Sequence, residues 1–147
     1  MRTLALLPLA ALLALGCSSS STDSTPGQQL SPLPGASQIT FQAERSTYRQ
    51  GDTATIVLRN GTSQPLGYNL CFSARELRTG DSWTRFSPLR VCTMDLKVLA
   101  PGAETQHKEP ITGEWQPGEY RIVTVVERMR SGDRGEIFTP TFTVHKN

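Results

Sequence analysis

The sequence predicts an all-β protein with one antiparallel β-sandwich domain, and three observations support this prediction. Short runs of alternating apolar and polar residues recur between residues 39 and 145, which is the pattern of half-buried strands. Turn residues such as glycine, proline, asparagine and aspartate separate these runs. No stretch of this region keeps a helical period, so a sandwich of about seven to nine strands is expected.

Several segments have the composition of strands. Residues 53–59 give a clear signal, because Ala54, Ile56 and Leu58 share one face of an extended chain. Residues 120–128 are expected to form the central strand, since a turn at Pro117-Gly118 leads directly into an apolar, β-branched run. The other expected strands are residues 39–44, 66–72, 75–78, 82–86, 95–99, 104–108 and 136–145.

Three local expectations are specific enough to compare with a structure. Residues 48–52 are predicted to form a turn. The alternation of residues 66–72 places Phe72 on the same face as Tyr68. In the last strand Phe138 is expected to point inward, and Pro140 marks an edge or a bulge.

The N-terminal region resembles that of a bacterial lipoprotein. Residues 1–16 have a basic start and an apolar run too short to span a bilayer, as in an export signal. The sequence Leu13-Ala-Leu-Gly-Cys17 resembles a lipobox, whose cysteine is acylated and becomes the new N-terminus. Residues 17–37 would then be the lipidated Cys17 and a disordered Ser/Thr/Pro linker, and residues 38–147 the folded domain.

This resemblance implies a protein anchored by lipid in the bacterial cell envelope. Each buried methylene of a palmitate-type chain contributes about 0.8 kcal/mol, so several chains on Cys17 would hold the protein firmly. Ser18 resembles the residue found after the cysteine in lipoproteins exported to an outer membrane, where they face the periplasm or the surface. The alternative is a plain secretory signal with an incidental cysteine.

Two cysteines remain once Cys17 is assigned to lipid. Cys71 and Cys92 are expected to form a disulfide in an oxidising compartment, which would contribute roughly 3 kcal/mol by closing a loop of about 20 residues. Two free thiols are the alternative. A metal site is less favoured, because neither cysteine has a second ligand at a suitable spacing.

Charge and motifs argue against catalysis and nucleic-acid binding. The formal net charge is +2, with basic and acidic residues interspersed, so no strong positive field indicates a nucleic-acid partner. His107 and His145 lie at expected strand ends without a partner cluster, and neither a nucleophile elbow nor a phosphate-binding loop is present in the sequence. We therefore expect no catalytic residues, no metal and no cofactor.

Turn and core motifs resemble those of a known class of domain. The strings Tyr48…Gly51-Asp52-Thr53, Leu99-Ala-Pro-Gly102 and Trp115-Gln-Pro-Gly-Glu-Tyr-Arg121 resemble bacterial immunoglobulin-like domains of small exported lipoproteins. They are more distantly similar to the Bacillus intracellular proteinase inhibitor family. The resemblance implies an immunoglobulin-like sandwich in which Tyr120 forms a tyrosine corner. Ile122 stands where the second cysteine of an antibody-type disulfide would be, so Cys71–Cys92 is expected to tie a core strand to the connection that follows it.

Residues 75–90 carry the candidate binding surface. Arginine and tryptophan are enriched at interface hot spots, and loops on a rigid sandwich are common binding sites. The alternative is structural: the aromatic side chains cover one end of the core, and the arginines solvate an edge strand. The candidate residues are Arg75, Arg78, Trp83, Arg85, Phe86 and Arg90.

The sequence therefore favours a lipid-anchored, non-enzymatic envelope protein with an Ig-like domain that acts as a protein-binding or structural module. Its expected partners are the membrane, through Cys17, and an unidentified envelope protein. The alternative function is proteinase inhibition, in which residues 87–92 present Arg90 to the pocket of a trypsin-like envelope protease.

Overall fold

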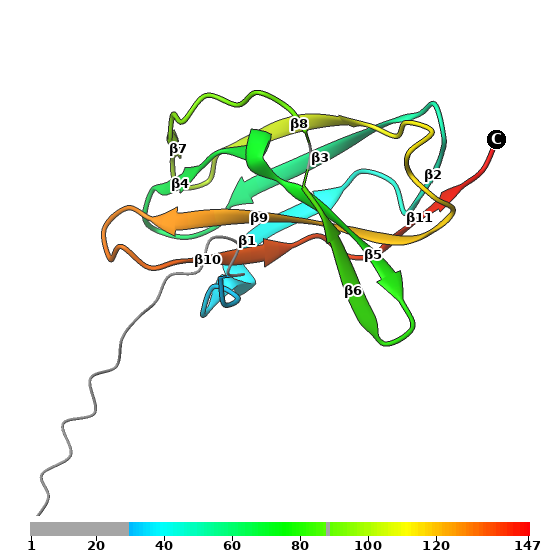
Figure 1. The fold of residues 1–147 in the computed structure, drawn as a ribbon. Coiled ribbons are helices and arrows are strands. Elements are labelled where there is room, and N and C mark those ends of the chain that lie inside the picture. Colours follow the sequence, from blue (N-terminus) through cyan, green and yellow to red (C-terminus); the bar gives the residue numbers. More distant parts are fainter. Residues whose placement is uncertain (1–29, 88) are drawn as a thin grey trace, which may run out of the picture.

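The computed structural model describes residues 30–87 and 89–147, and this part of the chain folds as an all-β sandwich of two sheets (Figure 1). The predicted fold class is confirmed. The expected signal of residues 1–16, Cys17 and the linker up to residue 29 lie outside the described residues. Within those described, no helix has the length and apolar character needed to cross a membrane.

The described chain contains eleven strands and two 3₁₀ helices. Two strands exceed the expected set: one overlaps the start of the predicted turn at residues 48–52, and the last expected strand is divided at Pro140. The elements are η1 (Ala36–Gln38), β1 (Ile39–Ala43), β2 (Thr47–Arg49), β3 (Thr53–Asn60), β4 (Leu66–Tyr68), η2 (Leu70–Phe72), β5 (Ala74–Thr79), β6 (Ser82–Phe86), β7 (Lys97–Leu99), β8 (Glu104–Pro110), β9 (Gly118–Arg128), β10 (Arg134–Phe138) and β11 (Phe142–His145).

Strand β9 is the centre of the large sheet, as the sequence predicts. It pairs antiparallel with β11 and then β10 along one edge, and with β5 and then β4 along the other. Beyond these, β2 pairs parallel with β11, β7 pairs with β4, and β6 pairs with β5. The small sheet has the order β1-β3-β8 and is antiparallel throughout.

The core fills the space between the two sheets. Ala54, Ile56 and Leu58 of β3 are 0 to 1% exposed, as their alternation predicts. An aromatic cluster closes one end of the core, where the rings of Trp115 and Tyr120 have centroids 4.7 Å apart. The other members of this cluster are Tyr48 and Phe142, at 5.4 Å from each other.

The ordered domain begins before residue 38. Leu33 is 4% exposed, and its N–H donates to the carbonyl of Glu136 at 2.9 Å. A Cβ at Gly135 would lie 2.7 Å from the backbone of Leu33, so glycine permits this close approach. Residues 31–33 thus pair with Glu136 of β10, within the stretch expected to be linker.

Two expectations about local structure are wrong. Tyr48 is not part of a turn: it is 1% exposed in β2, because the ring packs edge-on against Phe142. Phe72 does not continue the strand that contains Tyr68. The side chain of Asn69 accepts the N–H of Cys71 at 3.1 Å, which caps η2 and leaves Phe72 52% exposed.

The inward phase predicted for Phe138 is also wrong. Ile137 is the core residue of β10, whereas Phe138 lies on the opposite face, at 4.2 Å from the guanidinium of Arg121. The interruption at Pro140 separates β10 from β11, so the two strands do not share one alternation. Phe142 and Val144 point inward as expected.

Tyr120 forms the expected tyrosine corner. It is 2% exposed, and its hydroxyl donates to the carbonyl of Gln116 at 2.9 Å, across the turn that leads into β9. Burial raises the pKa of the hydroxyl, and the charge of Arg75 and the hydrogen bond to Gln116 offset part of that increase. The hydrogen bond between Tyr120 and Gln116 therefore stabilises the turn that leads into β9.

We predict that Tyr120→Phe lowers the free energy of unfolding by about 1 kcal/mol, because the Gln116 carbonyl loses its donor while packing is preserved. Urea denaturation followed by circular dichroism measures the change. The matched control is Tyr68→Phe, since Tyr68 is buried but its hydroxyl makes no hydrogen bond within the described residues. Equal effects of the two substitutions would contradict the role of the corner.

Candidate functional site

The structure places the six predicted surface residues on two faces of the β5–β6 hairpin and on the loop that follows it. Strand alternation puts Arg75 opposite Phe86 on the face turned toward the core. The opposite face, which we call the outer face, carries the other hairpin residues. These are Arg78, Trp83 and Arg85. Arg90 lies on the loop.

A buried carboxylate organises the outer face. Glu76 is 1% exposed and accepts two hydrogen bonds from Arg85, at 2.6 and 2.8 Å. Arg121 of β9 donates to the other oxygen of Glu76 at 2.6 Å. Arg85 also donates to both carboxylate oxygens of Glu136, at 2.7 and 3.0 Å. The hydrogen bond to Glu136 makes the largest contribution to raising the pKa of Arg85, against the opposing effect of burial.

Aromatic rings complete this network. The guanidinium of Arg121 lies 4.3 Å from the ring centroid of Trp83 and 4.2 Å from that of Phe138. Arg78 pairs with Glu119 at 3.1 Å, although both side chains are about half exposed. The arginines of the outer face are therefore engaged within the domain, which agrees more with the structural alternative than with an open cationic surface.

The expected Cys71–Cys92 disulfide is present, with Cα atoms 5.7 Å apart. It joins the connection after β6 to the 3₁₀ helix η2, not to a core strand as expected. Asn69 holds the same connection by donating to the carbonyls of Thr93 at 2.7 Å and Asp95 at 3.0 Å. We call residues 87 and 89–96, held in this way, the disulfide loop.

Arg90 anchors the disulfide loop from within. Its guanidinium donates to the carbonyls of Cys71 and Ser73, at 2.8 and 3.2 Å, and to Glu109 of β8 at 2.8 Å. Burial raises the pKa of Glu109, but hydrogen bonds with His107 and Arg90 outweigh burial, so the pKa lies below its ordinary value. Arg90 thus joins the segment between β4 and β5 to β8, the edge strand of the small sheet.

The disulfide loop exposes apolar side chains that the sequence analysis did not single out. Leu89 is 106% exposed, Val91 102% and Met94 86%. Their signal in the sequence is the presence of apolar residues close to a cysteine, in a segment expected to connect two strands. Arg90 and the carbonyls of Thr93 and Asp95 are hydrogen-bonded to the domain, while these apolar side chains point into solvent.

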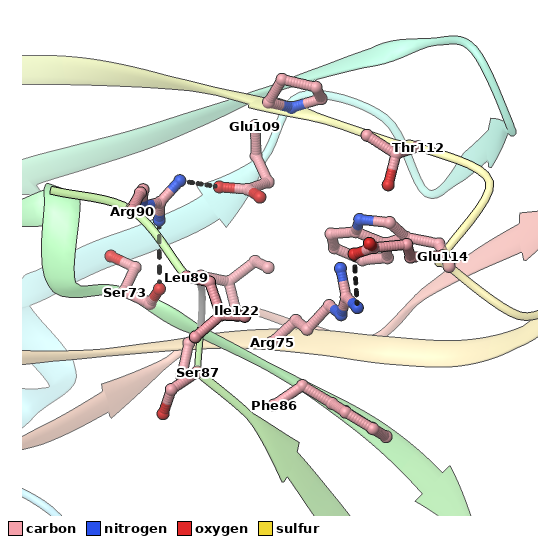
Figure 2. Close-up of a pocket in the computed structure, with 13 residues that line it drawn as sticks. Ser73, Arg75, Phe86, Ser87, Leu89, Arg90, Glu109, Thr112, Glu114 and Ile122 are labelled. Carbon is pink, nitrogen blue, oxygen red and sulfur yellow. Dashed lines mark hydrogen bonds and ion pairs between the residues drawn. The ribbon is translucent and has the colours of Figure 1, made fainter.

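A cleft opens beside the loop, between β5 and β8. Its volume is about 730 Å³, and Arg75 and Phe86 are the predicted surface residues that line it together with Arg90. Figure 2 shows Arg75 directed toward Glu114, while Arg90 is directed toward Glu109 and Ser73. Within the described ranges, no group of three or more histidine, cysteine or acidic side chains could hold a metal ion.

Comparisons with known proteins give no family. No protein-family model and no curated protein matches the chain. An uncharacterised protein from Bacillus anthracis is similar with 14% identity and a TM-score of 0.39, over 72% of this chain and 81% of the other. A neutral ceramidase from Pseudomonas aeruginosa is similar with 17% identity and a TM-score of 0.43, over 82% of this chain and 20% of the other. A PapD-like domain of human CEP192 gives 10% identity and a TM-score of 0.39, over 84% and 96%. Likenesses this weak carry no argument about family or activity.

We predict that Glu76→Gln lowers the free energy of unfolding by about 3 kcal/mol, because it leaves Arg85 and Arg121 without the buried charge they share. The measurement is chemical denaturation at pH 7. Glu119→Gln is the control, since its pair with Arg78 is exposed and should contribute less than about 1 kcal/mol. If both substitutions cost the same, the buried network does not stabilise the outer face.

Proposed function

We propose that this protein is a lipid-anchored, non-enzymatic component of the bacterial cell envelope whose β-sandwich binds another envelope protein. The lipobox-like sequence Leu13-Ala-Leu-Gly-Cys17 supports the anchor. The Ig-like resemblance of the folded part supports a binding module, since rigid sandwiches display loops for contact. In a bacterium with two membranes, Ser18 favours the outer membrane.

The observation that carries the binding proposal is the exposure of apolar side chains on a loop that is held rigidly. A mobile loop could expose Leu89 and Val91 by chance, but this one is fixed by a disulfide, by Arg90 and by Asn69. Holding the loop in place reduces the entropy lost when a partner covers it. Exposed apolar groups with this preorganisation are typical of a protein contact.

A protein partner fits this loop better than a lipid surface. A segment that inserts into an anionic membrane usually carries several unpaired lysines or arginines. Within the described part of the disulfide loop the charged residues are Arg90 and Asp95, and Arg90 is paired with Glu109. The inhibitor alternative is less favoured, because the Arg90 side chain is 25% exposed and directed toward the domain.

We predict that Cys17→Ser moves the protein from the membrane fraction to the soluble fraction, because the acyl chains have no attachment point. Immunoblots of fractionated cells measure the distribution, and circular dichroism of the purified variant checks that the domain stays folded. Ser18→Ala, next to it, should remain in the membrane fraction. Retention of Cys17→Ser in the membrane pellet would overturn the anchor.

We predict that a photo-crosslinking residue at position 91 captures one discrete envelope protein in cells, whereas the same residue at Thr40, on the exposed side of β1, does not. The captured protein, once purified, should bind the wild type and lose at least about tenfold in affinity for Leu89→Asp or Val91→Asp. Thr40→Asp is the matched control for an added charge. Unchanged binding of both loop variants would refute the contact.

A further inference from the structure

The cleft between β5 and β8 has the dimensions of a ligand site. Its volume of about 730 Å³ lies within the range of roughly 300 to 1,000 Å³ that is usual for small-molecule pockets. One wall comes from the start of β5 and from Phe86, and the other from the end of β8 and the turn before β9. Figure 2 shows charged and apolar side chains converging on this space.

Arg75 places a positively charged guanidinium at the cleft, and its N–H groups are available as hydrogen-bond donors. Its guanidinium lies over the ring of Trp115, 4.8 Å from the centroid, and 5.5 Å from that of Phe86. Within the described chain Arg75 makes no side-chain hydrogen bond, and the carboxylate that pairs with it is Glu114 at 3.9 Å. Glu114 is 84% exposed, so this weak pair can be displaced at little cost.

The other charges around the cleft cancel one another. Arg90 and Glu109 are paired at 2.8 Å, and His107 also contacts Glu109 at 3.2 Å. Arg75 is therefore the cation that remains available to a ligand. A planar guanidinium with unused N–H groups recognises a carboxylate through two parallel hydrogen bonds.

Two further features indicate the rest of the ligand. Phe86 is 40% exposed and Leu89 is fully exposed where they line the cleft, and Ile122 also lines it, so an apolar group finds contact surface there. Ser73 also lines the cleft, and its hydroxyl is buried without a hydrogen-bond partner. A buried hydroxyl in this state is unusual in a native protein and can serve a bound polar group.

We propose that this cleft binds a carboxylate next to a bulky apolar group, as found at the C-terminus of a peptide that ends in an aromatic or aliphatic residue. Arg75 receives the carboxylate in place of Glu114, and the apolar group packs against Phe86 and Leu89. Ser73 provides a further hydrogen bond. The site requires neither the lipid anchor nor the contact proposed for the disulfide loop.

The test uses the two tryptophans of the chain. Trp83→Phe leaves Trp115, in the wall of the cleft, as the single reporter of binding in the full chain purified in detergent. The probes are acetyl-Ala-Ala-Ala-Phe as a free acid, the same peptide as an amide, and N-acetylphenylalanine. The free acid should change the emission of Trp115, and the amide should bind at least about tenfold more weakly.

Substitutions on the two sides of the weak pair should act in opposite directions. Arg75→Gln should weaken binding of the free acid about tenfold or more, whereas Glu114→Gln should strengthen it several-fold by removing the internal competitor. Arg78→Gln, on the outer face of the same strand, should leave affinity unchanged. Unaltered circular dichroism of each variant confirms that the domain is folded, and Glu114 is too exposed for its replacement to disturb the core.

Equal binding of acid and amide, weaker binding by Glu114→Gln, or no binding of any probe would overturn the proposal. Binding of N-acetylphenylalanine as tight as that of the peptide supports a free acylated amino acid as the natural source. Tighter binding of the peptide supports a chain terminus. If no probe binds the cleft, the photo-crosslinking prediction for position 91 is unaffected. The cleft site and the proposed function can therefore fail separately.

Discussion

Strand β9 has to change hydrogen-bond partners part-way along both of its edges, and the rest of the fold is arranged around these changes. On one edge the partner changes from β11 to β10, and on the other from β5 to β4. Buried backbone groups at such breaks need polar side chains as partners. On the first edge, the N–H of Ile122 donates to the hydroxyl of Thr139, and the N–H of Thr139 donates to the carbonyl of Ile122, both at 2.9 Å. On the second edge, the side chain of Asn69 caps η2. The β5–β6 hairpin consequently diverges from the body of the sandwich (Figure 1).

The disulfide loop lies beside β8, where Arg90 pairs with Glu109. Three groups attach the loop to the domain: the sulfur of Cys92 is bonded to Cys71 of η2, Arg90 donates to backbone carbonyls and to Glu109, and the carbonyls of Thr93 and Asp95 accept from Asn69. None of these attachments uses the side chain of Leu89 or of Val91, and both side chains are fully exposed. The loop is therefore held to the domain while these apolar side chains remain exposed to solvent.

The sequence predicts most of the fold because alternation and turn residues act locally. The central strand, the β5–β6 hairpin, the tyrosine corner and the disulfide pair are all visible in it. The errors at Tyr48, Phe72 and Phe138 arise where tertiary contacts override the local pattern: a parallel partner strand, a side-chain cap and a break at Pro140. The candidate site is predicted less well, because composition cannot reveal which arginine has a carboxylate within reach.

Arg75 differs from its neighbours on the hairpin in what it contacts. Arg78 and Arg85 use their donors on carboxylates, whereas Arg75 lies over the indole of Trp115. A cation over a ring is stabilised through its face, so the N–H groups along the edge of the guanidinium stay available. Trp115 is fixed in the aromatic core beside Tyr120, which means that the central strand also sets the position of this cation. The same strand that determines the fold thus determines where the cleft can hold an anionic group.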